Sequence, residues 1–152
     1  MLDSTNRKIL NILQRDCKTS TRAIGEEVGL TAPAVSERIT RMKEAGIIRG
    51  YHADIDESAL GCTISAFIKI NVPPRSYDAF CRFCEEEPAI VEHHHIIGPE
   101  NALLRVRLSS SLELGELLEK LRHYGLSNTS VLLSTYFTHK DFSSEEEENH
   151  HE

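Results

Sequence analysis

The sequence of 152 residues contains no tryptophan, only 6% aromatic residues and no apolar run near the roughly 20 residues that a membrane-spanning helix needs. Its first residues, MLDSTNRKIL, carry charges where a secretory signal would have an apolar core. Hydrophobic residues make up 39% of the chain and charged residues 27%, as in folded globular proteins. We therefore expect a cytoplasmic protein with one ordinary domain or two small ones and no membrane partner.

Cysteine is also scarce. Cys17, Cys62, Cys81 and Cys84 are too few and too unevenly spaced for a disulfide framework, which favours a reducing compartment. Cys81 and Cys84 form a lone C-x-x-C pair inside a predicted helix. We interpret them as core residues rather than as zinc ligands or a redox pair.

The patterns that enzymes use are absent as well. We find no serine nucleophile elbow, no phosphate-binding glycine loop and no pair of carboxylates that could flank a substrate. The run His93-His94-His95 suggests a metal site, but neighbours on a strand point to opposite faces. Only His93 and His95 could share a side, so a third ligand would have to come from elsewhere. We predict no enzymatic activity, no cofactor and no metal.

The net charge of −7 is divided unevenly along the chain. Residues 1–50 contain nine Lys and Arg against six Asp and Glu, a net of +3, and residues 51–152 contain eight against eighteen, a net of −10. A basic front half can approach a polyanion while the acidic remainder keeps the protein in solution. Ordinary scatter of charge is the alternative interpretation.

The front half predicts three short helices. Ser20 can cap the second, over residues 21–27, and Gly29 ends it. Thr31 can cap the third, which Gly46 ends and whose apolar stripe is Val35, Ile39 and Met42. Polar and basic side chains occupy its other faces: Ser36, Glu37, Arg38, Thr40, Arg41 and Lys43.

Two helices joined by a tight glycine turn, the second with a basic outer face, are typical of a helix-turn-helix. Such a helix can offer donors to base edges while flanking cations hold phosphates, so the pattern predicts binding to double-stranded DNA. An ordinary surface helix is the alternative. Residues 47–54 then predict a strand or wing.

The second half predicts a ferredoxin-like β-α-β-β-α-β domain, a four-stranded antiparallel sheet with both helices on one face. The expected strands are residues 63–72, 89–97, 102–108 and 127–138, with helices between Pro74 and Pro88 and over 112–124. The bare sheet face would carry Phe67, Leu103, Leu132 and Tyr136, which is apolar enough to predict a second copy of the chain as its partner.

Over residues 2–138 the order and spacing of these motifs resemble the Lrp/AsnC family of bacterial and archaeal transcription regulators. The motifs that carry the resemblance are Leu2-Asp3 with Ile9-Leu10, Val28-Gly29-Leu30-Thr31, Arg38-Ile39, the run from Glu44 to Tyr51, Leu60-Gly61, Glu92-His93-His94 and Gly98.

The resemblance implies an α+β protein with an N-terminal winged helix-turn-helix and a C-terminal ferredoxin-like effector domain. The expected parts are a DNA-binding domain over residues 1–52, a connecting strand or linker over 53–62, an effector and oligomerisation domain over 63–140 and an acidic, disordered tail over 141–152. It also implies dimers whose sheets pack face to face, and assembly into tetramers or octamers.

The resemblance also assigns DNA-binding residues. Those expected to face the groove are Thr31, Ala32, Ala34, Ser36, Glu37, Arg38 and Arg41, with the arginine of the family falling on Arg38. Those expected to meet phosphates are Arg22, Lys43 and Arg49.

An effector, usually an amino acid, is implied near the loop Gly98, Pro99, Glu100, Asn101 and Ala102. Family members commonly have Asp and an aromatic residue where this chain has Asn101 and Ala102. One carboxylate for an effector's ammonium group is therefore missing, although Glu100 lies beside it. A different small molecule, or none, remains an alternative.

The sequence thus predicts an oligomeric, sequence-specific DNA-binding regulator modulated by an amino acid or a related small molecule. One alternative is a nucleoid-architectural protein that wraps DNA without an effector or strong sequence preference. A second is a small-molecule-binding module whose helix-turn-helix makes only protein contacts.

Overall fold

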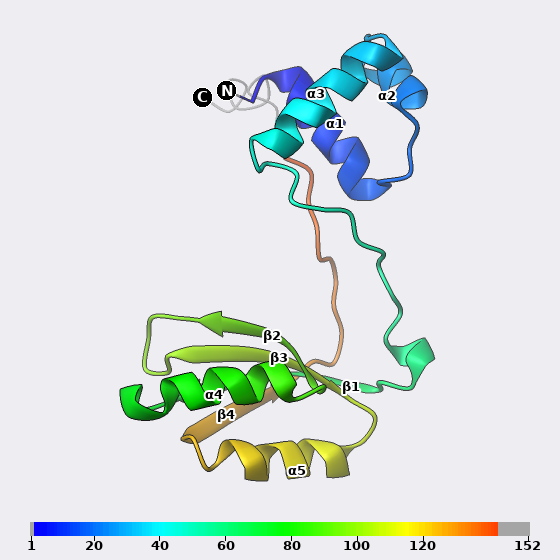
Figure 1. Cartoon of the computed structure of the whole chain (residues 1–152). Coiled ribbons are helices and arrows are strands. Elements are labelled where there is room, and N and C mark those ends of the chain that lie inside the picture. Colours follow the sequence, from blue (N-terminus) through cyan, green and yellow to red (C-terminus); the bar gives the residue numbers. More distant parts are fainter. Residues whose placement is uncertain (1, 143–152) are drawn as a thin grey trace, which may run out of the picture. The chain divides into compact units, whose positions relative to one another are not determined.

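The computed structural model describes residues 2–142, and these fall into two compact units. One contains residues 2–53 together with residues 136–142, and the other contains residues 54–135. Figure 1 shows the three helices of the first unit and the sheet with its two helices in the second. Residues 136–140, which the sequence analysis assigns to the effector domain, lie in this division with the helical unit, and the expected domain boundaries stay a prediction.

The helical unit consists of α1 (Ser4–Arg15), α2 (Thr21–Val28) and α3 (Ala32–Glu44). Each is capped by an oxygen from the residue before it: Asp3, Ser20 and Thr31 accept the backbone N–H of Asn6, Ala23 and Ala34 respectively. The core that unites the helices is small and apolar. Its buried members are Ile9, Ile12, Ile24, Val35 and Met42.

The turn between α2 and α3 depends on two glycines. Gly29 has a φ of 73°, a left-handed conformation that side chains with a Cβ disfavour. Gly25 is buried inside α2, and a Cβ placed on it would lie 2.4 Å from the carbonyl oxygen of Leu30. The absence of a side chain therefore lets the turn pack directly against α2.

The strand or wing predicted over residues 47–54 is absent from the structure. The backbone N–H groups of Ile47 and Ile48 donate to the carbonyl oxygen of Met42, at 2.9 and 3.1 Å, and so close the last turn of α3. These two N–H groups are therefore not free to pair with another strand. No strand forms over residues 47–54.

The second unit has the predicted β-α-β-β-α-β order and one short addition, the 3-10 turn η1 (Ser58–Leu60). Its elements are β1 (Ile64–Asn71), α4 (Pro74–Glu86), β2 (Ile90–His95), β3 (Ala102–Leu108), α5 (Ser111–Leu121) and β4 (Leu126–Val131). The strands form an antiparallel sheet in the order β2-β3-β1-β4. Both helices lie on the same face of it (Figure 1), and the core between helices and sheet includes Ile68, Ile70, Leu104 and Leu121.

The last strand is shorter than predicted. Pairing with β1 ends near Leu132, whose N–H donates to the carbonyl oxygen of Ser65 at 2.8 Å. Tyr136 therefore lies beyond the sheet, in the helical unit, with its side chain 93% exposed, and the prediction that it belongs to the bare sheet face is wrong. Phe67 and Leu103 alternate with the buried residues of their strands and occupy that face as predicted.

Candidate nucleic-acid interface and effector loop

The outer face of α3 is polar and accessible. Ser36, Glu37, Arg41 and Lys43 are all exposed. Arg41 forms an i, i+4 ion pair with Glu37, and both side chains remain more than 60% exposed. An exposed pair of this kind is weak in water, so the guanidinium of Arg41 can exchange its carboxylate partner for a phosphate or a base edge at little cost.

The cations expected to meet phosphates lie around α3 and on α2. The ammonium group of Lys43 sits 4.8 Å from the ring centre of Tyr51, which orients it without neutralising it. Arg49 is exposed after the end of α3. Arg22 is on α2, paired with Glu26 at 3.0 Å and 86% exposed.

The start of α3 presents smaller groups. Thr31 is exposed, but its hydroxyl oxygen accepts the N–H of Ala34 at 3.4 Å and so caps α3. Ala32 and Ala34 are half-buried. Only part of each methyl group is therefore accessible for contact with the major groove of DNA.

Arg38 is placed differently from the groove-facing position that the resemblance implies. Its Nη1 donates to Asp3 Oδ2 at 2.6 Å and to Asn6 Oδ1 at 2.9 Å, and its side chain is only 33% exposed. The hydrogen bond from Arg38, together with that from the backbone N–H of Asn6, holds the pKa of the Asp3 carboxyl below its usual value. Arg38 thus joins α3 to the start of α1 through the carboxylate that also caps α1.

The loop expected to bind an effector lies between β2 and β3. Gly98 and Pro99 are exposed and Glu100 is half-buried. Asn101, in contrast, uses its side chain inside the protein: Val72 N donates to its Oδ1 at 2.9 Å and its Nδ2 donates to Val72 O at 2.7 Å. Ala102 is fully buried in the sheet core. Only the first three members of the predicted set therefore offer groups to a ligand in this conformation.

The histidine run follows the alternation expected of a strand. His93 and His95 point to the side of α4, where the hydroxyl of Tyr77 lies 2.8 Å from His95 Nδ1 and the ring of Phe80 meets His93 edge-on. Burial lowers the pKa of His93, and the neighbouring imidazoles of His94 and His95 act in the same direction.

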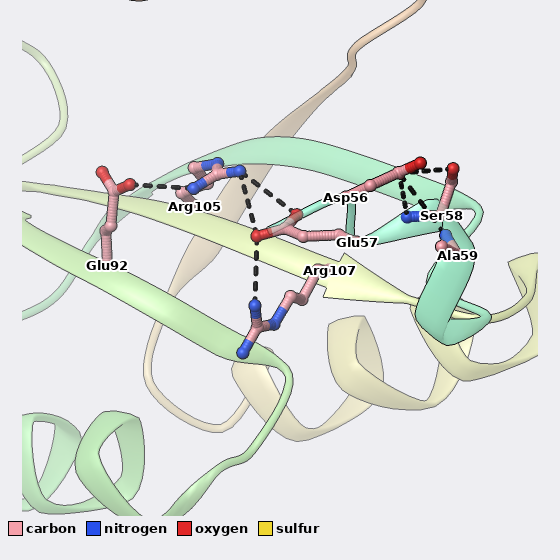
Figure 2. A network of polar contacts seen from close by, with 7 residues as sticks. All are labelled: Asp56, Glu57, Ser58, Ala59, Glu92, Arg105 and Arg107. Atoms are coloured by element: carbon pink, nitrogen blue, oxygen red, sulfur yellow. Dashed lines mark hydrogen bonds and ion pairs between the residues drawn. The ribbon is translucent and has the colours of Figure 1, made fainter. Parts of the chain in front are cut away.

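A polar network that the sequence did not reveal fixes the linker to the bare sheet face (Figure 2). The carboxylate of Glu57 accepts both Arg105, at 3.2 and 3.3 Å, and Arg107, at 3.1 Å. Arg105 also donates to Glu92 of β2 at 3.1 Å. The alternation of β3 predicts that Arg105 and Arg107 share a face, but nothing in the sequence places Glu57 against them.

Comparison with known proteins agrees with this architecture. Residues 2–43 match the model of the AsnC-type helix-turn-helix domain, and residues 65–142 match that of the Lrp/AsnC ligand binding domain. The chain is 32% identical over 141 residues to the HTH-type transcriptional regulator FL11 of Pyrococcus horikoshii. The matched region covers 92% of this chain and 93% of that protein.

Solved structures give the same answer. The structure of LrpC from Bacillus subtilis superimposes with a TM-score of 0.85 at 26% identity, covering 91% of this chain and 99% of that one. A feast or famine regulatory protein from M. tuberculosis, complexed with L-methionine, superimposes with a TM-score of 0.82 at 27% identity, covering 91% and 96% of the two chains. The chain belongs to the Lrp/AsnC family and is a DNA-binding transcriptional regulator.

Proposed function

We propose that this regulator binds duplex DNA through the exposed face of α3, with Ser36, Glu37 and Arg41 toward the major groove and with Arg22, Lys43 and Arg49 on phosphates. The observation that carries the assignment is the exposed, basic face of a helix that follows a tight glycine turn. A helix of that kind fits the major groove of B-DNA, and a dimer would present two of them to a palindromic site.

Arg38 has a separate role in this proposal. Because its guanidinium is bound by Asp3 and Asn6, it fixes the orientation of α3 rather than reading bases. It is therefore a positioning residue.

The test compares two pairs of substitutions in the full chain. Arg41→Ala with Lys43→Ala removes two cations from the proposed interface, whereas Arg75→Ala with Arg82→Ala removes two exposed cations from α4. We expect the first pair to weaken binding to a duplex from the gene's own upstream region at least about tenfold and to flatten its salt dependence, with little effect from the second. Equal losses from both pairs would refute the assignment.

The same titration separates regulation from DNA packaging. A regulator prefers its operator over mixed-sequence DNA by about a thousandfold or more at fixed salt, whereas an architectural protein shows a ratio near one. Unchanged DNA affinity of the Arg41→Ala, Lys43→Ala variant would favour the second alternative, a small-molecule-binding module whose helix-turn-helix contacts only protein.

The bare sheet face supports the proposal that the protein acts as a dimer, alone or within a tetramer or octamer. It carries half-buried Phe67, Leu103 and Leu132 and, toward the opposite end of β4 from Leu132, Leu126, which is 89% exposed. Apolar side chains in such a group are costly to leave in water, and a second copy offers a matching surface. Because a transcriptional regulator acts where the DNA is, we place the protein in the cytoplasm. Separately, none of the helices within residues 2–142 is long and apolar enough to cross a membrane.

The effector domain supports modulation by an amino acid or a related small molecule. A similar protein was solved with L-methionine, and here the accessible loop groups are Gly98, Pro99 and Glu100. Thermal-shift measurements against the amino acids test this directly, because a ligand at a hundred times its Kd stabilises the folded state by about 2.7 kcal/mol. A ligand that raises Tm should also change DNA affinity, and the coupling must be equal in both directions.

A further inference from the structure

The C-terminal segment returns to α1 and is held there by its backbone. Asn11 Nδ2 donates to the carbonyl oxygen of Phe142 at 3.0 Å, and the N–H of Phe142 donates to Asn11 Oδ1 at 2.8 Å. The side-chain amide of Asn11 thus both donates to and accepts from the backbone of one residue, as a peptide group does between antiparallel strands. Such a pair fixes the direction of the bound segment as well as its position.

Two further contacts lie next to that pair on the same side of α1. Arg15 meets the carboxylate of Asp141 through two nitrogens, at 2.6 and 3.3 Å, and Gln14 Nε2 approaches the carbonyl oxygen of Lys140 at 3.4 Å. Positions 11, 14 and 15 are three and four residues apart, so their side chains share one face of the helix. Each contact is solvent-exposed and weak alone, so the segment is held by the set of contacts together.

The residues that follow Phe142 change the charge of the DNA-binding unit. Residues 143–152 lie outside the described part of the chain and beyond the family match, and they contain five glutamates and no Lys or Arg. Residues 1–53 carry +3, and Lys140 cancels Asp141. The unit therefore has a net charge of +3 without this tail and −2 with it, so its sign is reversed.

Only Ser143 and Ser144 separate Phe142 from the first of these glutamates in the sequence. Three residues span at most about 11 Å even when the chain is fully extended. A compact unit of fifty residues has a radius of gyration of about 10 Å, close to the Debye length of about 10 Å at 0.1 M salt. A carboxylate within that reach of α1 would therefore be in electrostatic range of phosphates bound by the same unit.

We propose that the face of α1 formed by Asn11, Gln14 and Arg15 is a docking surface for the chain's own C-terminal segment, and that this contact holds the acidic tail where it opposes DNA binding. The tail is then an internal, salt-sensitive inhibitor of the helix-turn-helix unit. Undocking it, or neutralising it, releases the full affinity of that unit. The inference rests on the proposed binding of DNA by α3.

The test uses the full chain and a labelled duplex of mixed sequence. Neutralising the tail by Glu145→Gln, Glu146→Gln, Glu147→Gln and Glu148→Gln should strengthen binding about five- to tenfold near 50 mM salt and less than about twofold near 300 mM. The matched control makes the same change in charge on α4 and α5: Glu85→Gln, Glu86→Gln, Glu116→Gln and Glu119→Gln. It should have a much smaller effect.

The docking contact is tested by Asn11→Ala, which removes both hydrogen bonds to Phe142, keeps the charge and favours the helix. It should strengthen binding in the natural chain and have no effect in the tail-neutralised chain, a coupling that a double-mutant cycle measures. Equal effects of Asn11→Ala in both backgrounds, or an α4/α5 control as strong as the tail variant, would overturn the inference. If no variant binds DNA at low salt, the proposed function itself has failed.

Discussion

Replacing Gly25 by alanine separates two physical effects of opposite sign. Helix propensity alone predicts that alanine inside α2 stabilises the protein by about 1 kcal/mol. The structure predicts the reverse, because the new Cβ would lie 2.4 Å from the carbonyl oxygen of Leu30, about 1 Å closer than ordinary contact. A backbone oxygen cannot rotate away, so we take about 3 kcal/mol for the overpacking, the upper part of the usual range. The net expectation is a loss of about 2 kcal/mol.

Gly115 provides the matched control. It lies inside α5, and no atom is within 4 Å of the Cβ that alanine would add there. Gly115→Ala should therefore stabilise the sheet unit by about 0.5–1 kcal/mol.

Urea unfolding followed by circular dichroism measures both changes, and amide hydrogen exchange assigns each to its unit. DNA affinity should fall only in Gly25→Ala, since the turn that orients α3 is displaced. A Gly25→Ala protein that is as stable as the natural one would refute the close approach of α2 and its turn.

Three other predictions follow from individual groups. Asp3→Ala removes a helix cap and the partner of Arg38, so we expect a loss of at least about 1 kcal/mol in urea unfolding together with weaker DNA binding; full DNA affinity would contradict the role of Arg38 in positioning α3. Because the pKa of His93 is lowered in the folded protein, the unfolded chain binds a proton at this residue at higher pH than the folded chain does. The free energy of unfolding should therefore be highest above about pH 6.5 and decrease as the pH falls below it. His93→Phe should flatten that pH dependence in thermal melts. Burial raises the pKa of Cys84 to about 12, so a maleimide at pH 8 should label exposed Cys17 and spare Cys84 in the folded protein.

Local rules predicted much of this molecule. The caps at Ser20 and Thr31 and the glycine at 29 are short-range features, and the alternation of residues 64–71 decides which side chains are buried. The order of helices and strands along the chain and the polar face of α3 follow from such patterns, because each depends on neighbours within a few residues.

Features that depend on distant partners were missed. The side chain of Arg38 turns to Asp3, 35 residues away, and Asn101 bonds the backbone of Val72, 29 residues away. The pattern of α3 shows that position 38 is polar but not which carboxylate it meets. In the same way, the contact of Phe142 with Asn11 joins segments 131 residues apart, and neither segment alone indicates it.

Sedimentation of the purified full chain, first alone and then with the duplex from its own upstream region, tests most directly whether the protein binds DNA as an assembly of paired chains. We expect a dimer or a multiple of two in free solution, and a complex that contains an even number of chains on each site. A single chain that sediments by itself and leaves the duplex unbound at low salt would contradict that expectation.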